Sequence, residues 1–207
     1  MRVPVGAHDN RPMTTAGSDR GDQPTLTGKR VRLRPWRPDD VPAVVAACQD
    51  AELQRWTQVP VPYRRDDAEA FVGVIASQTW AAGGALFAVE PRDGGPLLAS
   101  IGLFPPSDCF GEAGYWTVAE HRGRGFTAEA LAVLADWVFG SVGLGRLELH
   151  VDPANVGSRR VAQRAGFSAE GLVRQRFLHR GKPSDVLLYA RLADDVRPAF
   201  GPSPGAV

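Results

Sequence analysis

The sequence predicts a mixed α/β domain: a mostly antiparallel central sheet of six to seven strands with helices on both faces. Two patterns predict it. In several short segments apolar residues alternate with polar ones, which is typical of strands with one buried face. In other segments apolar residues recur at helical spacing. The two kinds of segment are interleaved along 207 residues, of which 43% are hydrophobic, and this is enough for one core.

The first half of the chain supplies one strand and two helices. Residues 31–35 alternate apolar residues with arginines, which indicates a strand. Pro38-Asp39-Asp40 opens a helix to residue 48, because acidic residues favour the positive end of the helix dipole. Residues 55–63 contain prolines and are expected to form a loop, and a second helix is expected over 66–80.

The second half of the chain alternates strands and helices. Residues 92–96, Arg-Asp-Gly-Gly-Pro, predict a hairpin turn, and residues 181–184 predict another turn. Gly166 is expected to end the last helix. The expected strands are 86–90, 97–104, 112–118, 147–151, 167–177 and 186–192, and the expected helices are 127–139 and 155–165.

Composition limits the possible partners. The formal net charge of +1 predicts no nucleic-acid partner, and no apolar run is long enough to span a bilayer, so no membrane partner is expected. Two cysteines do not make a disulfide scaffold, and no residues have metal-ligand spacing, so no metal is expected. We expect a cytoplasmic protein, and a homodimer stays open.

The two ends of the chain differ from its middle. Residues 1–25 are rich in Gly, Pro, Asp, Asn, Arg and Ser, which predicts a flexible N-terminal tail. Residues 196–207 predict a flexible C-terminal tail, so that one domain spans 26–195. Translation from Met13 in place of Met1 is a further hypothesis.

The most informative segment is a strand, a glycine loop and a helix over residues 115–131. Its loop is Arg122-Gly123-Arg124-Gly125-Phe126-Thr127. Glycines allow a sharp turn and close approach of a ligand. The first N–H groups of the helix have no intrahelical partner, and the helix dipole favours negative charge beside them. Together with two arginines, this pattern predicts a phosphate or pyrophosphate site.

Other nucleotide sites fit this loop less well. A P-loop needs Gly-Lys-Ser/Thr, and the loop has no lysine. A dinucleotide fingerprint matches Gly123, Gly125 and Ala128, but it normally opens a domain at its first strand. Here the match comes after several strands that look antiparallel, and Glu148, at the distance of a ribose contact, falls inside a strand. A glycine-rich helix start that binds nothing is the remaining alternative.

The loop resembles the Gln/Arg-x-x-Gly-x-Gly/Ala signature of the GNAT superfamily of N-acetyltransferases, with Thr127 where Gly or Ala is usual. The pattern is most similar to the RimJ/RimL-type subgroup, which acetylates N-terminal alanine or serine of ribosomal proteins. The similarity covers roughly residues 26–192. The segments that carry it are 33–35 with 39–40, 112–116, 155–158 with 165–167, 170–174 and 185–189.

The resemblance implies an acetyl-CoA-dependent N-acetyltransferase with no metal. It implies a V-shaped split between two parallel middle strands, those ending at Val118 and Val151. It places pantetheine against the backbone near Thr117 and Val118, with Asn155 close by. It places the pyrophosphate on the loop, and the residues implied for it are Arg122, Gly123, Arg124, Gly125, Phe126 and Thr127.

The resemblance also implies two catalytic residues. Glu112 stands where several GNAT enzymes hold a carboxylate base; the alternative is a solvent-facing strand residue. Ser158 is implied as proton donor to the departing sulfur, because Ala162 stands where many relatives have a tyrosine. The alternative for Ser158 is a helix-capping or packing role.

The acceptor stays open at this stage. A primary amine is implied, either at a peptide N-terminus or on a small molecule. A module of the same fold that binds acyl-CoA as a sensor or scaffold, without chemistry, is the second hypothesis, and nucleotide-dependent oxidoreduction is the third.

Overall fold

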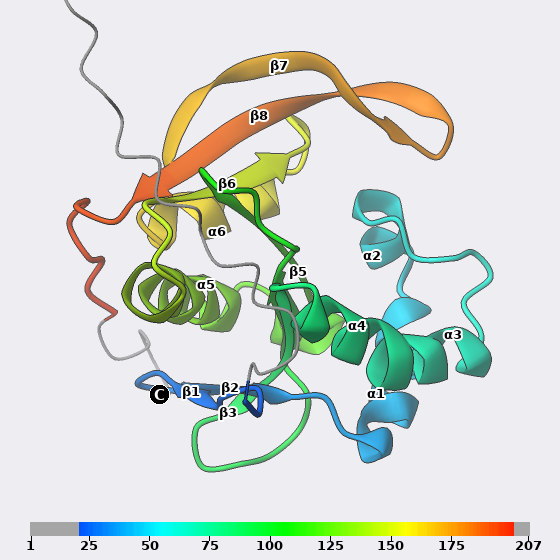
Figure 1. The fold of residues 1–207 in the computed structure, drawn as a ribbon. Coiled ribbons are helices and arrows are strands. Elements are labelled where there is room, and N and C mark those ends of the chain that lie inside the picture. Colours follow the sequence, from blue (N-terminus) through cyan, green and yellow to red (C-terminus); the bar gives the residue numbers. More distant parts are fainter. Residues whose placement is uncertain (1–20, 201–207) are drawn as a thin grey trace, which may run out of the picture.

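The structure, a computed structural model, describes residues 21–200, so that residues 1–20 and 201–207 of the predicted tails lie outside it. Eight strands form one sheet in the order β1-β2-β3-β4-β5-β6-β8-β7 (Figure 1). Neighbouring strands are antiparallel except β5 and β6, which are parallel. The predicted fold class is confirmed, with one more strand than expected, the two-residue β1.

The element bounds follow the predicted pattern closely. The strands are β1 Leu26–Thr27, β2 Val31–Pro35, β3 Ala85–Pro91, β4 Ala99–Leu103, β5 Gly111–Thr117, β6 Arg146–Val151, β7 Ser168–His179 and β8 Lys182–Leu192. The helices are η1 Pro38–Asp40, α1 Val41–Cys48, α2 Ala51–Trp56, α3 Arg65–Glu69, η2 Ala70–Ile75, α4 Ala76–Ala81, η3 Ala119–His121, α5 Phe126–Trp137, η4 Val138–Val142 and α6 Val156–Arg164.

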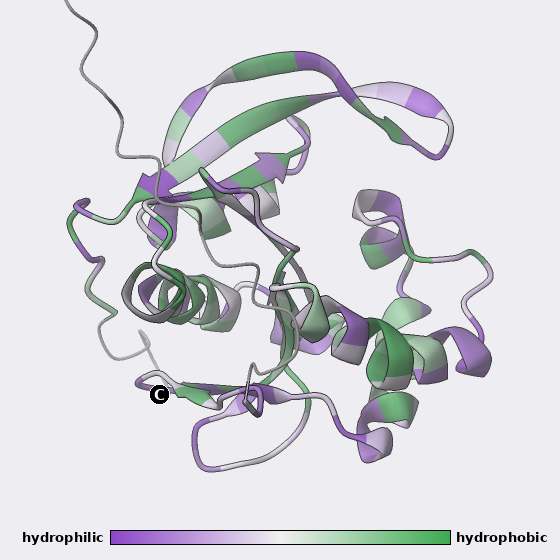
Figure 2. Ribbon diagram, in the orientation of Figure 1, coloured by the Kyte–Doolittle hydropathy of each residue, from purple (hydrophilic) through white to green (hydrophobic). Residues whose placement is uncertain are grey.

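The sheet has a different apolar layer on each face. Successive strand residues point to opposite faces, and on β3 Phe87 packs into the core under α5, while Ala88 packs into the core under α1 and α3. Figure 1 shows α5 and α6 on one side of β5 and α1 to α4 on the other. Figure 2 shows the apolar residues of α1 and η2 as green bands in the second layer. Helices therefore cover both faces.

Three local predictions need correction. Residues 55–63 were expected to form a loop, but Arg55 and Trp56 belong to α2, a helix of six residues whose start is capped by Asp50. The first proline of this segment is Pro60, which lies beyond the extended C-cap residue Thr57 and so does not exclude the helix. The predicted turn at residues 181–184 is shorter, because β8 begins at Lys182. The helix expected over 66–80 contains a π-helical stretch, η2.

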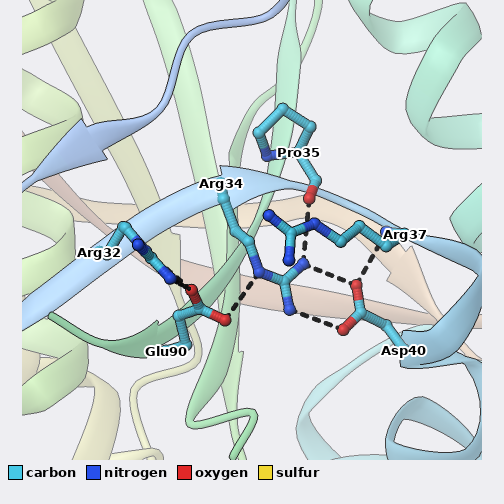
Figure 3. A network of polar contacts seen from close by, with 6 residues as sticks. All are labelled: Arg32, Arg34, Pro35, Arg37, Asp40 and Glu90. Carbon is cyan, nitrogen blue, oxygen red and sulfur yellow. Dashed lines mark hydrogen bonds and ion pairs between the residues drawn. The ribbon is translucent and has the colours of Figure 1, made fainter. Parts of the chain in front are cut away.

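A buried network of charges ties β2 to β3 and to the start of α1 (Figure 3). Arg34 donates to Glu90 at 2.7 Å and to both oxygens of Asp40 at 2.8 Å. Asp40 also accepts from the amide of Arg37 at 2.8 Å, and Glu90 pairs with Arg32 as well. Arg34, Asp40 and Glu90 are less than 9% exposed. Each buried charge in the network is therefore paired, as burial requires.

The parallel strands β5 and β6 pair only at their beginnings. Gly111 lies opposite Leu147 and Glu112 lies opposite Glu148, and no later residues are paired. Residues 113–117 of β5 and 149–151 of β6 therefore diverge. This divergence is the V-shaped split that the resemblance implied, and it opens the sheet in the middle.

Candidate functional site

A cleft of about 1080 Å³ occupies the split between β5 and β6. It is bounded by the glycine loop and the start of α6, and on the other side by α2 and the β7–β8 hairpin. Eight of the predicted site residues line it: Glu112, Thr117, Arg122, Gly123, Gly125, Thr127, Asn155 and Ser158. Three predicted residues, Val118, Arg124 and Phe126, do not line it.

The glycine loop has the backbone that the sequence predicted. Gly123 and Gly125 have φ angles of 74° and 79°, which glycine adopts without strain. Among the described residues, the first amide of α5 with a backbone acceptor is that of Glu129, which donates to Gly125 O at 3.2 Å. The amides before it point out of the helix start, as an anion site requires.

Guanidinium groups surround the loop from two other elements. A Cβ atom built on Gly125 would lie 3.3 Å from Arg164 of α6 and 3.5 Å from Arg30. Arg30 is held there by Glu129, which accepts from its amide at 2.6 Å and from its Nε at 2.7 Å. A glycine whose missing side chain leaves space between cationic groups and free amides fits a pyrophosphate.

Thr127, which departs from the family pattern, does not fill the loop. Its hydroxyl hydrogen-bonds that of Thr117 at 2.7 Å, and the residue is only 4% exposed. The side chain therefore joins the end of β5 to the start of α5 and leaves the Thr127 amide available at the helix start.

The remaining loop residues have protein partners. Arg122 forms an ion pair with Asp50, the residue that caps α2. The guanidinium of Arg124 lies 5.1 Å from the centre of the Phe126 ring. The Val118 amide donates to Leu98 O at 3.0 Å, and the Val118 carbonyl accepts from His121 N at 2.9 Å. A ligand would have to use the second lone pair of that carbonyl.

Ser158 lies at the start of α6 against a tyrosine of β5. Asn155 caps this helix by accepting from the Ser158 amide at 2.9 Å. The Ser158 hydroxyl lies 2.7 Å from the hydroxyl of Tyr115, which also donates to Ser158 O at 3.2 Å. Burial raises the pKa of the Tyr115 phenol, and the bond to Ser158 opposes this only in part. The phenol therefore stays protonated near neutral pH and can donate.

Glu112 lies on the opposite face of β5 from Tyr115. The strand alternation gives Glu112 the same face as Trp116, which packs under η2 and α1, whereas Tyr115 packs towards α5. Glu112 Oε1 lies 3.2 Å from His150 Nδ1, and the Glu112 side chain is 36% exposed. The two predicted catalytic residues thus reach the split from opposite faces of the sheet.

The wall beside Glu112 is closed by contacts between distant segments. At the tip of the β7–β8 hairpin, Arg180 donates to the carbonyl of Gln54 at 2.7 Å, and Gln58 donates to Leu178 O at 3.1 Å. The hairpin consequently reaches across to α2, as Figure 1 shows. Trp56 of α2 and Phe177 of β7 both line the cleft.

Two residues of the site, Tyr115 and His150, were not predicted from the sequence. Tyr115 is the first residue of the strand–loop–helix segment 115–131, but nothing indicated that its partner would be Ser158, 43 residues away. His150 belonged to an alternating strand, where a polar residue normally faces solvent. The pairing of β5 with β6 brings His150 to Glu112, and the packing of α6 beside β5 brings Ser158 to Tyr115; neither arrangement can be read from the sequence.

The described part of the chain offers neither a cluster of metal ligands nor a membrane-spanning helix. Among residues 21–200, no three His, Cys, Asp or Glu residues come together in a way that could hold a metal ion. No helix in the same range is both long enough and apolar enough to cross a bilayer.

Comparison with known proteins identifies a family. Residues 30–168 match the family model described as an acetyltransferase (GNAT) domain. The chain is 27% identical over 169 residues to YoaA of Bacillus subtilis (strain 168), an uncharacterized N-acetyltransferase; the match covers 81% of this chain and 96% of that protein.

Two other relatives have more specific names. The ribosomal-protein-serine acetyltransferase of Escherichia coli (strain K12) is 34% identical over 97 residues, which cover 47% of this chain and 54% of that protein. The solved structure of Mycobacterium smegmatis RimJ, in complex with CoA-disulfide, superposes with a TM-score of 0.70 at 25% identity, over 83% of this chain and 87% of that one.

Proposed function

This chain belongs to the GNAT family and is an acetyl-CoA-dependent N-acetyltransferase, and from that premise we propose that its acceptor is the α-amino group of a protein N-terminus. The name of the ribosomal-protein-serine acetyltransferase supports a protein acceptor, and the resemblance of the sequence to the RimJ/RimL-type subgroup supports its α-amino group. The observation that carries the proposal is the cleft itself: Glu112 and Ser158 face the same split from opposite sides of β5. An amine and a thioester can therefore meet between them.

We assign the cofactor-binding role to the glycine loop. The amides before Glu129 and the guanidinium of Arg164 lie beside Gly125 in the cleft, and Arg30, paired with Glu129, lies behind them. Acetyl-CoA supplies the thioester that an unprotonated amine can attack. What this chain adds is a fixed position for the phosphates and two groups that move protons.

Glu112 and Ser158 divide the proton transfers. An ammonium ion cannot attack a carbonyl carbon, so the carboxylate of Glu112 removes its proton. The Ser158 hydroxyl, hydrogen-bonded to Tyr115, donates a proton to the departing sulfur. The helix cap formed by Asn155 holds the amide of Ser158 and so fixes the direction of its side chain.

A first experiment tests the acceptor. Peptides that begin with Ser or Ala would be incubated with acetyl-CoA and the protein, and the modified nitrogen would be located by mass spectrometry. We expect acetylation of the α-nitrogen. The matched peptide, blocked at the α-nitrogen and carrying an internal lysine, is expected to remain unmodified. Modification of the lysine instead would contradict the proposed acceptor.

A second experiment tests the loop. The substitution Gly125→Asp adds a side chain within van der Waals distance of Arg164 and Arg30 and a negative charge where the phosphates would lie. It also forces a non-glycine residue to a φ of 79°. We expect loss of measurable acetyl-CoA binding by calorimetry. Unchanged affinity would refute the loop assignment.

A binding module without chemistry is the alternative function. It predicts the same acetyl-CoA affinity but no CoA release with any amine. Release of CoA in proportion to acetylated peptide, measured by chromatography, separates the enzyme from the module.

A further inference from the structure

The imidazole of His150 lies between two carboxylates at the floor of the cleft. Its Nδ1 lies 3.2 Å from Glu112 Oε1, and its Nε2 lies 3.8 Å from Glu148 Oε2. The His150 side chain is 11% exposed and that of Glu148 is 12% exposed, whereas that of Glu112 is 36% exposed. The imidazole is therefore shielded, and the carboxylate beside it opens into the cleft.

The sheet register explains this position. Glu112 and Glu148 are opposite each other in the last pair of β5 and β6 before the strands diverge. His150 is the next residue of β6 on the same face. It therefore occupies the point at which the split begins and reaches back to Glu112.

The charges around the two carboxylates differ. Glu148 accepts from Arg146 Nε at 2.6 Å, and Arg146 in turn binds Glu170 of β7. On the neighbouring strand β8, the residues opposite Glu148 and His150 are Ala190 and Leu188, which carry no charge. Among the described residues, the charged contact of Glu112 is His150.

The walls of the cleft hold further titratable groups. These cleft-lining residues are Glu52 and Arg55 of α2, His121 and Arg122 at the glycine loop, Asp152 after β6, Arg160 and Arg164 of α6, and Arg176 and His179 of β7. No ion pair joins them to Glu112 or His150 among residues 21–200. The pair that can exchange a proton at the floor is therefore Glu112 with His150.

We propose that His150 is a positioning and proton-accepting partner of Glu112, so that the base of the reaction is a Glu–His pair. The inference rests on the proposed function. In the reaction the ammonium gives one proton to Glu112, the N–C bond forms and the C–S bond breaks, and the sulfur takes a proton from Ser158. The second proton that the nitrogen loses as the amide forms replaces the proton that Ser158 gave, and the proton taken by Glu112 leaves to solvent. His150 holds Glu112 towards the split and takes the proton that Glu112 has gained, so that the carboxylate is restored for the next turnover.

The test uses substitutions that separate hydrogen bonding from proton exchange. His150→Gln keeps an amide that can donate to Glu112 but cannot titrate. We expect kcat for a Ser peptide to fall on the order of tenfold at pH 7, and the pH dependence of kcat to change. Acetyl-CoA affinity by calorimetry and the unfolding temperature are expected to stay the same.

Glu170→Gln is the matched control. It alters the far end of the same row of charges, at an exposed residue outside the cleft lining, and is expected to leave kcat unchanged. If His150→Gln lacks a cooperative unfolding transition, the shorter amide in His150→Asn provides the same test. A wild-type kcat and pH profile in a folded His150 variant would overturn the inference.

A double substitution tests whether the two residues act as a unit. If they do, Glu112→Gln/His150→Gln loses no more activity than Glu112→Gln alone. Losses that multiply would overturn the inference and leave the acetyl transfer itself intact. A wild-type protein that binds acetyl-CoA but acetylates no peptide would instead contradict the proposed function.

Discussion

Two groups of charged side chains lie on the same face of the sheet and differ in what surrounds them. The first is the buried network of Arg32, Arg34, Asp40 and Glu90 at β2 and β3 (Figure 3). The second is the row of Arg146, Glu148, His150 and Glu112 at β5 and β6. The cross-strand pairs of β3, β4 and β5 place both groups on one face.

The difference lies in the continuity of the strands beneath them. Under the first group, β2 and β3 pair along the whole of β2, and each charge has a fixed partner. Under the second group, β5 and β6 separate after Glu112, so that the row ends at the cleft. Where the strands pair along their length, as β2 and β3 do, the charged side chains serve to stabilise the fold. Where the strands separate, as β5 and β6 do, the carboxylate of Glu112 can also contact a ligand in the cleft.

The largest effect is expected when the closed network is broken. Arg34→Met removes the ion-pair partner of the buried Asp40 carboxylate. It also removes one of the two arginines that pair with Glu90, so that only Arg32 remains. Removing one partner of a buried ion pair costs about 3–5 kcal/mol, and we expect a loss of this size in the free energy of unfolding. Urea denaturation at pH 7 measures it.

The control for this substitution is an exposed pair in the same chain. Arg65→Met removes the ion pair with Glu69, whose two side chains are 67% and 52% exposed. Because water screens such a pair, the expected loss is below about 1 kcal/mol. Equal losses for both variants would show that burial does not distinguish the two pairs.

A substitution of Glu112, in the row of charges at β5 and β6, is expected to change activity and to leave stability unchanged. Glu112→Gln keeps the shape of the side chain but removes the proposed base, and we expect kcat to fall by about 10²-fold or more, with acetyl-CoA affinity unchanged. Peptide acetylation under saturating acetyl-CoA measures it. Glu69→Gln, on the outer surface of α3, serves as the control. A stability loss in Glu112→Gln as large as that in Arg34→Met would remove the contrast.

Acid should weaken the closed network. Burial raises the pKa of Asp40 and of Glu90, but hydrogen bonds from Arg34, with those from the Arg37 amide and from Arg32, outweigh it and leave both pKa values below the ordinary range. A carboxyl group with a lowered folded-state pKa stabilises the fold above its unfolded pKa, roughly 4, and loses this contribution as pH falls. Urea denaturation from pH 6 to pH 3 should show the decline.

The Arg34→Met variant sharpens the acid test. Without the guanidinium, the pKa values of Asp40 and Glu90 are expected to rise, so that less stability remains to be lost on acidification. The variant should therefore show a shallower decline below about pH 4 than the wild type. Parallel declines would mean that other carboxylates cause the acid sensitivity.

Local chemistry made the glycine loop and most of the strands predictable. The loop depends on two glycines with positive φ angles, Gly123 and Gly125, directly before the helix α5. All of these residues are neighbours in the sequence, so the pattern can be read without knowing the fold. Every strand except the two-residue β1 was expected from the sequence within a few residues. The helix α2 was missed because it is only one and a half turns long and the prolines that follow it dominate the pattern.

The polar contacts of the site could not be predicted in the same way. Glu112 meets His150 because β5 and β6 pair in one particular register, and Tyr115 meets Ser158 because α6 packs beside β5. A shift of one residue between β5 and β6 would turn His150 to the opposite face from Glu112. The register is decided by the whole core, and single residues in the strands carry no sign of it. The resemblance placed Glu112 and Ser158 but said nothing of their partners.

The smallest expected effect concerns the face of β5 turned away from Glu112. Tyr115→Phe removes the hydroxyl that contacts Ser158 at 2.7 Å and keeps the ring in the core. A hydrogen bond of this kind contributes about 0.5–1.5 kcal/mol, which corresponds to roughly a two- to tenfold loss of kcat if it orients the serine. Ser158→Ala should lose more, because it removes the proposed donor itself. If the two variants lose equally, and the double variant loses no more, the phenol and the hydroxyl act as one donor. The split between β5 and β6 would then hold a proton-transfer pair on each of its faces.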